Sequence, residues 1–210
     1  MGVDYEALLE LMRTRRSVRG FLPEPLGPEI LDKLIDAARW APSAGNRQAW
    51  RFLAVESPQT LARMGEAVAE AVQRLRGAVR ADLRSMADRY LDNFLHFTSA
   101  PVVLVPIWRP GAAPSRAVGP AAARPSDGDE EGLASVAAAI QNLLLAAHAL
   151  GVGACWMTGP LAAREALERL LNVPDGWRIA ALIPLGKPAA AAAATAPARR
   201  DAARLLHRVG

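Results

Sequence analysis

The stretch from 133 to 150 constrains this chain more than any other, because it is apolar almost all round a helix. It carries no charged residue, and Gly151 follows at the position where helices often end in a left-handed residue. A helix without a polar face is buried among other elements. We therefore expect a core helix. The amides of Gln141 and Asn142 need partners if they are buried, whereas at an interface they could bond another chain or a ligand.

Short apolar runs and helical patterns alternate along the rest of the chain. Pro28 opens one helix at its first position, and that helix ends before Pro42. Pro184 indicates that the last apolar run lies near a sheet edge or a strand end. This alternation predicts an α/β or α+β protein, in a single domain spanning 1–210, whose helices pack over one sheet. The predicted helices span 5–13, 28–41, 59–95, 133–150 and 161–171, and the predicted strands span 50–55, 102–107, 154–157 and 179–185.

Two segments break this alternation. Residues 109–132 are rich in Pro, Gly and Ala and show no apolar period, which is typical of a mobile loop. Residues 188–210 join an alanine tract to a basic tail that is too far from any core-like segment to fold alone. Arg199 and Arg200 make this tail cationic, and they either lie in solvent or meet an anion.

Composition excludes several classes of protein. The single cysteine cannot form an internal disulfide framework, and with three histidines a structural zinc site is not expected. The acidic opening lacks the basic start of a secretion signal, and we expect no apolar run long enough to span a bilayer. The net charge of +4 mixes 25 basic with 21 acidic residues, and aromatic residues are too few for a base-stacking platform. We therefore predict a cytoplasmic protein that binds neither membranes nor nucleic acid.

Arg15, Arg16 and Arg19 lie within five residues, with Ser17 among them. A guanidinium offers paired donors that match a phosphate group, and a hydroxyl adds a further hydrogen bond. The same cations also suit the carboxyl end of the preceding helix, whose dipole they complement. Spacing alone leaves both interpretations open.

A loop that joins a helix to a strand, residues 41–50, carries polar groups suited to a ligand. Ser43, Asn46 and Gln48 can donate and accept hydrogen bonds, and Gly45 lets the backbone approach a ligand closely. Ser and Asx turns explain such residues equally well. The loop is therefore either a binding loop or a tight turn.

The run GVGACWMTGP, residues 151–160, joins a helix end to a short strand and a turn. Thr158 and Gly159 could present backbone N–H groups at a strand end, a common place for ligands in open sheets. The run precedes a strand and so is not a GxGxxG dinucleotide fingerprint. Cys155 has apolar neighbours typical of a core thiol, and no Ser–His–Asp arrangement can be assigned.

Taken together, these segments resemble the FMN-dependent nitroreductase family. The resemblance rests on ordered stretches that span nearly the whole chain: TRRSVRGF at 14–21, APSAGNRQAWRF at 41–52, IQNLLLAAHALGVGACWMTG at 140–159 and IPLGKP at 183–188. It implies an α+β fold with a central mixed or antiparallel sheet flanked by helices. It also implies an intertwined homodimer, in which the tail wraps the partner and the subunit interface holds FMN at two sites.

The resemblance implies which residues bind the cofactor. Those that would hold the phosphate and ribityl chain, the last two from the partner's tail, are Arg15, Arg16, Ser17, Arg19, Arg199 and Arg200. Those that would reach the flavin ring or line the site from the partner subunit are Asn46 and Gln48, then Pro42, Ser43 and Ala44. The backbone of Met157, Thr158 and Gly159 would face the isoalloxazine, with an N–H near its reactive nitrogen.

The chemistry that the resemblance implies is the flavin's own. NADH or NADPH would reduce FMN and leave, and a small acceptor such as a nitroaromatic or a quinone would take its place. No side chain is assigned a catalytic role. The segment RRSVRGFLPEPL also resembles the branch of the family that fragments its reduced FMN to make dimethylbenzimidazole, although that branch prefers Asp where Ser17 stands. A flavin-binding protein without efficient turnover is a further alternative.

Overall fold

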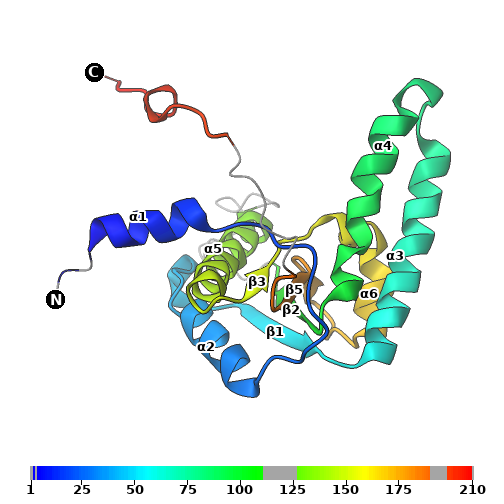
Figure 1. Ribbon diagram of the computed structural model, residues 1–210, viewed down its shortest axis with the longest axis horizontal. Helices are drawn as coiled ribbons and strands as arrows, with labels where there is room; N and C mark the ends of the chain where they lie inside the picture. Colours follow the sequence, from blue (N-terminus) through cyan, green and yellow to red (C-terminus); the bar gives the residue numbers. More distant parts are fainter. Residues whose placement is uncertain (1, 3, 111–126, 190–197, 210) are drawn as a thin grey trace, which may run out of the picture.

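The computed structural model describes residues 2, 4–110, 127–189 and 198–209. Within them, five strands form one antiparallel sheet in the order β1-β2-β5-β3, with β4 also pairing β2 (Figure 1). The strands are β1 Trp50–Val55, β2 Val102–Trp108, β3 Gly153–Ala154, β4 Arg178–Ile179 and β5 Ile183–Gly186. The α-helices are α1 Tyr5–Thr14, α2 Pro28–Arg39, α3 Pro58–Ala78, α4 Arg84–Leu91, α5 Asp127–Ala149 and α6 Arg164–Leu170. Short 3₁₀ helices include η1 Ala44–Asn46, η2 Ala81–Leu83, η3 Asp92–Ser99 and η5 Gly159–Ala163.

Strand β2 is buried along its whole length, because helices cover both faces of the sheet. Val102 and Leu104 belong to a core with α2 and α5, whereas Val103 and Val105 belong to a core with α3, η3 and α6. Successive side chains of a strand point to opposite faces, so one apolar run serves two cores. The α+β architecture expected from the sequence is confirmed.

The core helix α5 forms as predicted but is buried along one face only: about a third of the apolar window within Glu130–Ala149 is buried, and Gln141 is exposed. Its buried side chains, such as Ile140 and Leu143, have no exposed surface and pack toward α2 and the sheet. The helix ends in a Schellman motif: the N–H of Val152 donates to Ala147 at 2.8 Å, and Gly151 takes a φ of 70°. Asn142 finds its partner in the carbonyl of Ala37 on α2, at 3.2 Å.

Two expectations about this region are wrong. By length and composition alone, a test that core helices also pass, the stretch Glu130–Ala149 is long and apolar enough to cross a membrane, whereas the sequence analysis expects no such run. The predicted loop 109–132 also ends too late, because α5 begins at Asp127. The acidic residues at 127–131 complement the positive end of a helix dipole and favour helix there. The rest of that predicted loop, 111–126, lies outside the described residues.

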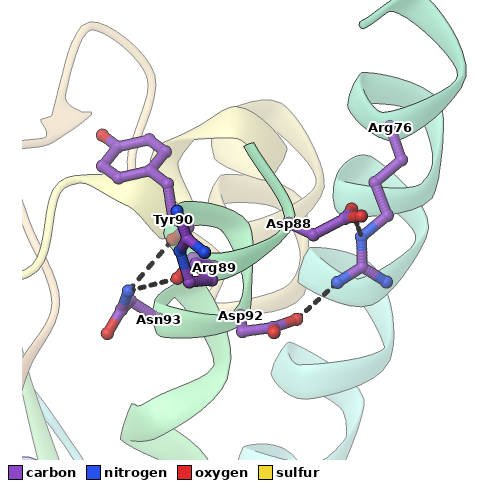
Figure 2. A network of polar contacts seen from close by, with 6 residues as sticks. All are labelled: Arg76, Asp88, Arg89, Tyr90, Asp92 and Asn93. Carbon is purple, nitrogen blue, oxygen red and sulfur yellow. Dashed lines mark hydrogen bonds and ion pairs between the residues drawn. The ribbon is translucent and has the colours of Figure 1, made fainter. Parts of the chain in front are cut away.

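The helix expected over 59–95 is broken into a hairpin. Helix α3 ends at Ala78, and the chain returns through η2 into α4 and η3. Arg76 of α3 joins the two arms, because its guanidinium meets Asp88 at 3.2 Å and Asp92 at 2.5 Å (Figure 2). Asn93 in turn donates to the carbonyls of Arg89 and Tyr90, at 2.7 and 3.3 Å. The hairpin projects from the sheet beside α6 (Figure 1).

The run 179–185, expected as one strand, is divided between β4 and β5. β5 is not an edge strand, since it lies between β2 and β3. Pro184 is tolerated there because it lies where the pairing with β3 ends: its carbonyl accepts from Cys155 at 3.4 Å, but it has no N–H to donate. Helix α1 and the described part of the tail, 198–209, both extend away from the sheet (Figure 1).

Candidate functional site

The segment from Arg15 to Gly20, here called the arginine segment, is tied to the sheet by its backbone. The N–H of Val18 donates to the carbonyl of Ala154 at 2.9 Å. The N–H of Ala189 donates to Gly20 at 3.1 Å, and Phe21 forms a β-bridge with Pro188. The segment therefore runs beside β3, next to the run 155–159 that the sequence singled out.

A glycine makes this approach possible. A Cβ added to Gly153 would lie 2.8 Å from Cγ1 of Val18 and 3.1 Å from the carbonyl oxygen of Gly186. Both distances are too short for a side chain to fit without moving its neighbours. Only glycine at 153 lets the arginine segment lie flat against β3.

The side chains of this segment act on Cys155. Burial raises the pKa of the Cys155 thiol, while Arg19, a hydrogen bond from Ser17, and Arg15 oppose that rise. Cys155 is buried, and a raised pKa keeps it a protonated thiol at neutral pH, so it is not an activated nucleophile. Of the side chains in this segment, Arg19 also lines a cleft with residues 155–160.

A cleft of about 150 Å³ opens at this point. Arg19 contributes to one wall, and the run from Cys155 to Pro160 forms another. The third wall comes from the second arm of the α3–α4 hairpin, where α4 continues into η3. The hairpin residues in this wall are Tyr90, Asn93 and Phe94. The cleft thus combines aromatic surface with a guanidinium, an amide and a hydroxyl.

The lack of a side chain at Gly159 lets the hairpin pack closely against the cleft. A Cβ at this position would lie 2.4 Å from the ring of Phe94, so the backbone touches an aromatic face directly. Phe94 also packs edge-to-face with Tyr90, with ring centroids 5.1 Å apart. The predicted turn at 158–159 therefore lies against two aromatic side chains that the sequence analysis missed.

The three arginines of the predicted cluster have different surroundings in the structure. Arg19 is exposed at the cleft, and Arg15 is half-buried. Arg16 Nη1 instead donates to the carbonyls of Arg13 and Arg15, at 2.6 and 3.0 Å. In this conformation Arg16 closes the carboxyl end of α1, as the helix-end interpretation of the cluster proposed.

In the predicted turn, 157–159, some backbone groups are likewise already paired within the chain. The N–H of Met157 donates to Leu182 at 3.0 Å and its carbonyl accepts from Leu182 at 2.9 Å, so both groups belong to the sheet. The carbonyl of Thr158 accepts from Leu161 at 3.0 Å. An N–H for a bound ring would therefore have to come from Thr158 or Gly159.

The loop that contains Pro42, Ser43 and Ala44 lies elsewhere in the chain. It follows α2, on the opposite side of the molecule from α4 in Figure 1. It is anchored to α5, because the N–H of Ala44 donates to Ser135 at 3.3 Å. No residue of this loop lines the cleft of the described chain.

This loop nevertheless has the backbone of a specialised site. Asn46 and Gln48 adopt positive φ values of 52° and 49°, beside Gly45 at 58°. Ser43 accepts from the N–H of Gln48 at 3.0 Å, and the Gln48 amide donates to Asn46 at 3.2 Å. Non-glycine residues in this conformation cost free energy and concentrate at functional sites. Arg199 and Arg200, the other residues predicted apart from the arginine segment, are exposed in the tail.

Sequence reasoning missed the hairpin wall of the cleft, as well as Trp156. Residues 59–95 were interpreted as a helix with a solvated charged face. Tyr90, Asn93 and Phe94 stand at i, i+3 and i+4 and so share one face. Two aromatics and an amide on one side of a charged helix are the pattern that could have indicated a wall.

Fold and site together define an α+β protein with an antiparallel sheet, a cationic segment laid along its end strand, and an aromatic cleft beside it. The sequence profile described as "Nitroreductase family" matches residues 12–187. The chain belongs to the nitroreductase family.

Three similar proteins illustrate this membership. A 5,6-dimethylbenzimidazole synthase of Rhodobacter capsulatus is 32% identical over 211 residues, covering 98% of this chain and 90% of that protein. A BluB-like flavoprotein from Clostridium difficile superposes with a TM-score of 0.84 at 23% identity, covering 100% of both chains. An iodotyrosine deiodinase bound to FMN and 3-iodo-L-tyrosine superposes with a TM-score of 0.75 at 25% identity, covering 97% of this chain and 98% of that one.

Proposed function

We propose that this protein is an FMN-dependent NAD(P)H oxidoreductase that reduces small acceptors such as nitroaromatics or quinones. The single observation that carries the proposal is the placement of the arginine segment beside the run 155–159, along the aromatic cleft. Membership of the nitroreductase family and the FMN in the deiodinase structure support it.

The residues present fit the chemistry of FMN. Guanidinium groups and a hydroxyl suit its phosphate, and aromatic surface suits a planar ring. Arg15 and Arg19, with Ser17, would hold the phosphate and ribityl chain. Arg16 would join them after releasing the carbonyls of α1, which its flexible side chain allows. When bound, FMN would supply the hydride and electron chemistry, for which this chain needs no catalytic side chain of its own.

The protein's part would be to bind, orient and exclude water. Thr158 and Gly159 would offer backbone N–H groups to the ring, while Phe94 and Trp156 would shield it. An N–H near the ring stabilises the charge that reduction adds. The hairpin residues Tyr90 and Asn93 would stand where an acceptor enters.

We further propose that the working form is a homodimer. The cleft in one chain, about 150 Å³, is smaller than the ~300–1,000 Å³ typical of cofactor pockets, so further walls are needed. The loop 42–48 and the tail arginines are available to supply them from a second copy. Exposed apolar side chains on α1 and the tail, among them Tyr5, Met12, Leu205 and Leu206, are suited to such an interface.

The experiment is an anaerobic one with the purified protein. We expect a yellow protein whose flavin is bleached by NADH or NADPH and is reoxidised by a nitroaromatic or a quinone. A colourless protein that takes up no FMN would refute the proposal. Flavin that binds but stays oxidised with both nicotinamides would instead identify a flavin-binding protein without efficient turnover.

A second candidate is a dimethylbenzimidazole synthase, favoured by the 32% identity over almost the whole chain to an enzyme of that name. Ser17 argues against it, because that branch prefers Asp at this position. Reduced FMN bound to the protein would be exposed to oxygen and the products separated by mass spectrometry. Formation of dimethylbenzimidazole would establish this second function, and recovery of intact FMN alone would exclude it. Ser17→Asp provides the matched variant.

A further inference from the structure

His148, near the end of α5, contacts the residue that immediately precedes the arginine segment. Its ring Nε2 lies 2.8 Å from Oγ1 of Thr14, the last residue of α1. The Thr14 hydroxyl donates its one proton to the carbonyl of Glu10 at 2.8 Å. With its proton directed to Glu10, the Thr14 hydroxyl would accept from the imidazole in the tautomer that carries its proton on Nε2. Arg15 is the next residue of the chain, so this bond fixes the start of the cationic segment.

Among the residues that the structure describes, the charged groups that shift the pKa of His148 are both cationic. They are the guanidinium groups of Arg15 and Arg16, from the segment that follows α1. Helix α5 contributes no charged residue between 133 and 150, and α1 contributes the Thr14 hydroxyl. Burial lowers the pKa of His148 below its ordinary value of 6.5, and Arg15 and then Arg16 lower it further. In the protein without an anion, the imidazole is thus held neutral at pH 7.

We propose that His148 is a positioning residue of the phosphate site, and that binding of a phosphate-bearing ligand draws a proton onto it. The proposal rests on the proposed function, since it takes the arginine segment as the phosphate site. A dianion beside Arg15 and Arg16 would offset the cationic field that keeps His148 neutral. The carboxyl end of α5, a site of partial negative charge, would then also favour the imidazolium.

The sign of the pH dependence follows from linkage. If the pKa of His148 is higher in the complex than in the free protein, binding takes up a proton. The added affinity is then fully present below the pKa of the free protein, and it is lost as pH rises through the pKa of the complex. A rise of one pKa unit would give up to about a tenfold gain in affinity, and half a unit about threefold.

The direct test is an NMR titration of the His148 ring in the intact protein, loaded first with FMN and then with riboflavin. The two ligands differ in the phosphate alone. We expect a higher pKa for His148 with FMN, by about half a unit or more. Equal pKa values with the two ligands would overturn the proposal. Failure of the protein to bind either flavin would refute the proposed function instead.

A binding experiment checks the consequence. His148→Gln keeps a donor for Thr14 but cannot titrate, and His96→Gln on η3 is the matched control. We expect the ratio of the FMN dissociation constants, variant over parent, to grow about threefold or more for His148→Gln between pH 8 and pH 5.5. The ratio for His96→Gln should not change with pH, because His96 lies on η3, outside the arginine segment. Ionisation of the FMN phosphate affects variant and parent alike, so it cancels in both ratios. A flat ratio for His148→Gln as well would contradict the proposal, and the NMR titration decides if that variant does not fold.

Discussion

The arginine segment and the C-terminal tail carry the same chemistry but differ in how they are held. Residues 15–20 form backbone hydrogen bonds with Ala154 and Ala189, and the segment leads directly into Phe21, which is 9% exposed. Residues 198–209 are exposed along their whole length and extend away from the sheet (Figure 1). Both contain adjacent arginines, so charge pattern does not distinguish them.

The difference lies in where the partner of each segment is found. The arginine segment pairs with a strand end of its own chain, and its place is fixed by the fold. The tail has an amphipathic, basic sequence but shows no such pairing in its described part. In the proposed homodimer, a second copy of the chain would supply the surface on which the tail docks. Three predictions test the contrast, in order of decreasing effect.

The largest effect is expected at the anchor of the arginine segment. Phe21→Ala removes a core side chain and should lower the free energy of unfolding by about 3–5 kcal/mol. Leu22→Ala, at the next residue, is the control. Leu22 is 37% exposed, so its truncation should cost less than about 1 kcal/mol. Denaturant titration of both variants measures the difference. Similar losses for the two would mean that the segment is not anchored by its core residue.

The next effect concerns the cation at the start of the segment. Arg15→Ala should weaken FMN binding roughly ten- to a hundredfold, because one charge-assisted phosphate contact is worth about 1.5–3 kcal/mol. Arg63→Ala on α3, an exposed arginine remote from the cleft, should leave the dissociation constant unchanged. Fluorescence titration with FMN measures both. An Arg15→Ala variant that binds like the parent would remove this residue from the site.

The smallest effect is expected in the tail. Arg199→Ala and Arg200→Ala should each be compared with the parent protein. Loss of the arginine that reaches the phosphate should weaken FMN binding about threefold to tenfold, because the contact is exposed. Deletion of 197–210 should lower both the FMN content and the dimer fraction, measured by absorbance and by sedimentation. A truncated chain that keeps both would show that the tail has no part in the site.

The contrast also explains which parts of the fold could be predicted. The core helix, β1, β2 and the ends of α1 and α2 follow from local rules: apolar period, Pro28 at a helix start and Gly151 at a helix end. The break after α3 has only one weak local signal, Gly77, because Gly65 lies within the same helix without ending it. The bend itself is held by the tertiary ion pair of Arg76 with Asp88. The division of 179–185 accompanies a one-residue change of register along β2, between the pairs Leu104–Ile183 and Ile107–Ile179, which is tertiary information.

The site divides along the same line. Charge and spacing identified Arg19 and Thr158 as candidates, and both line the cleft. Charge and spacing did not identify Phe94, because its place at the cleft depends on the hairpin packing against Gly159. They also could not separate Arg16, which donates to the end of α1, from its neighbours, since side-chain direction is not encoded in spacing. The assignments of all these residues to FMN, those of the arginine segment and of 157–159 included, stay predictions.

The central claim is that the guanidinium groups of the arginine segment recognise a phosphate. The most direct measurement compares the dissociation constants of FMN and riboflavin for the parent protein and for Arg15→Ala. We predict that the parent binds FMN at least about a hundredfold more tightly than riboflavin, and that Arg15→Ala loses at least about tenfold of this preference. Equal affinities of the parent for the two flavins, or a preference that Arg15→Ala leaves intact, would contradict the account.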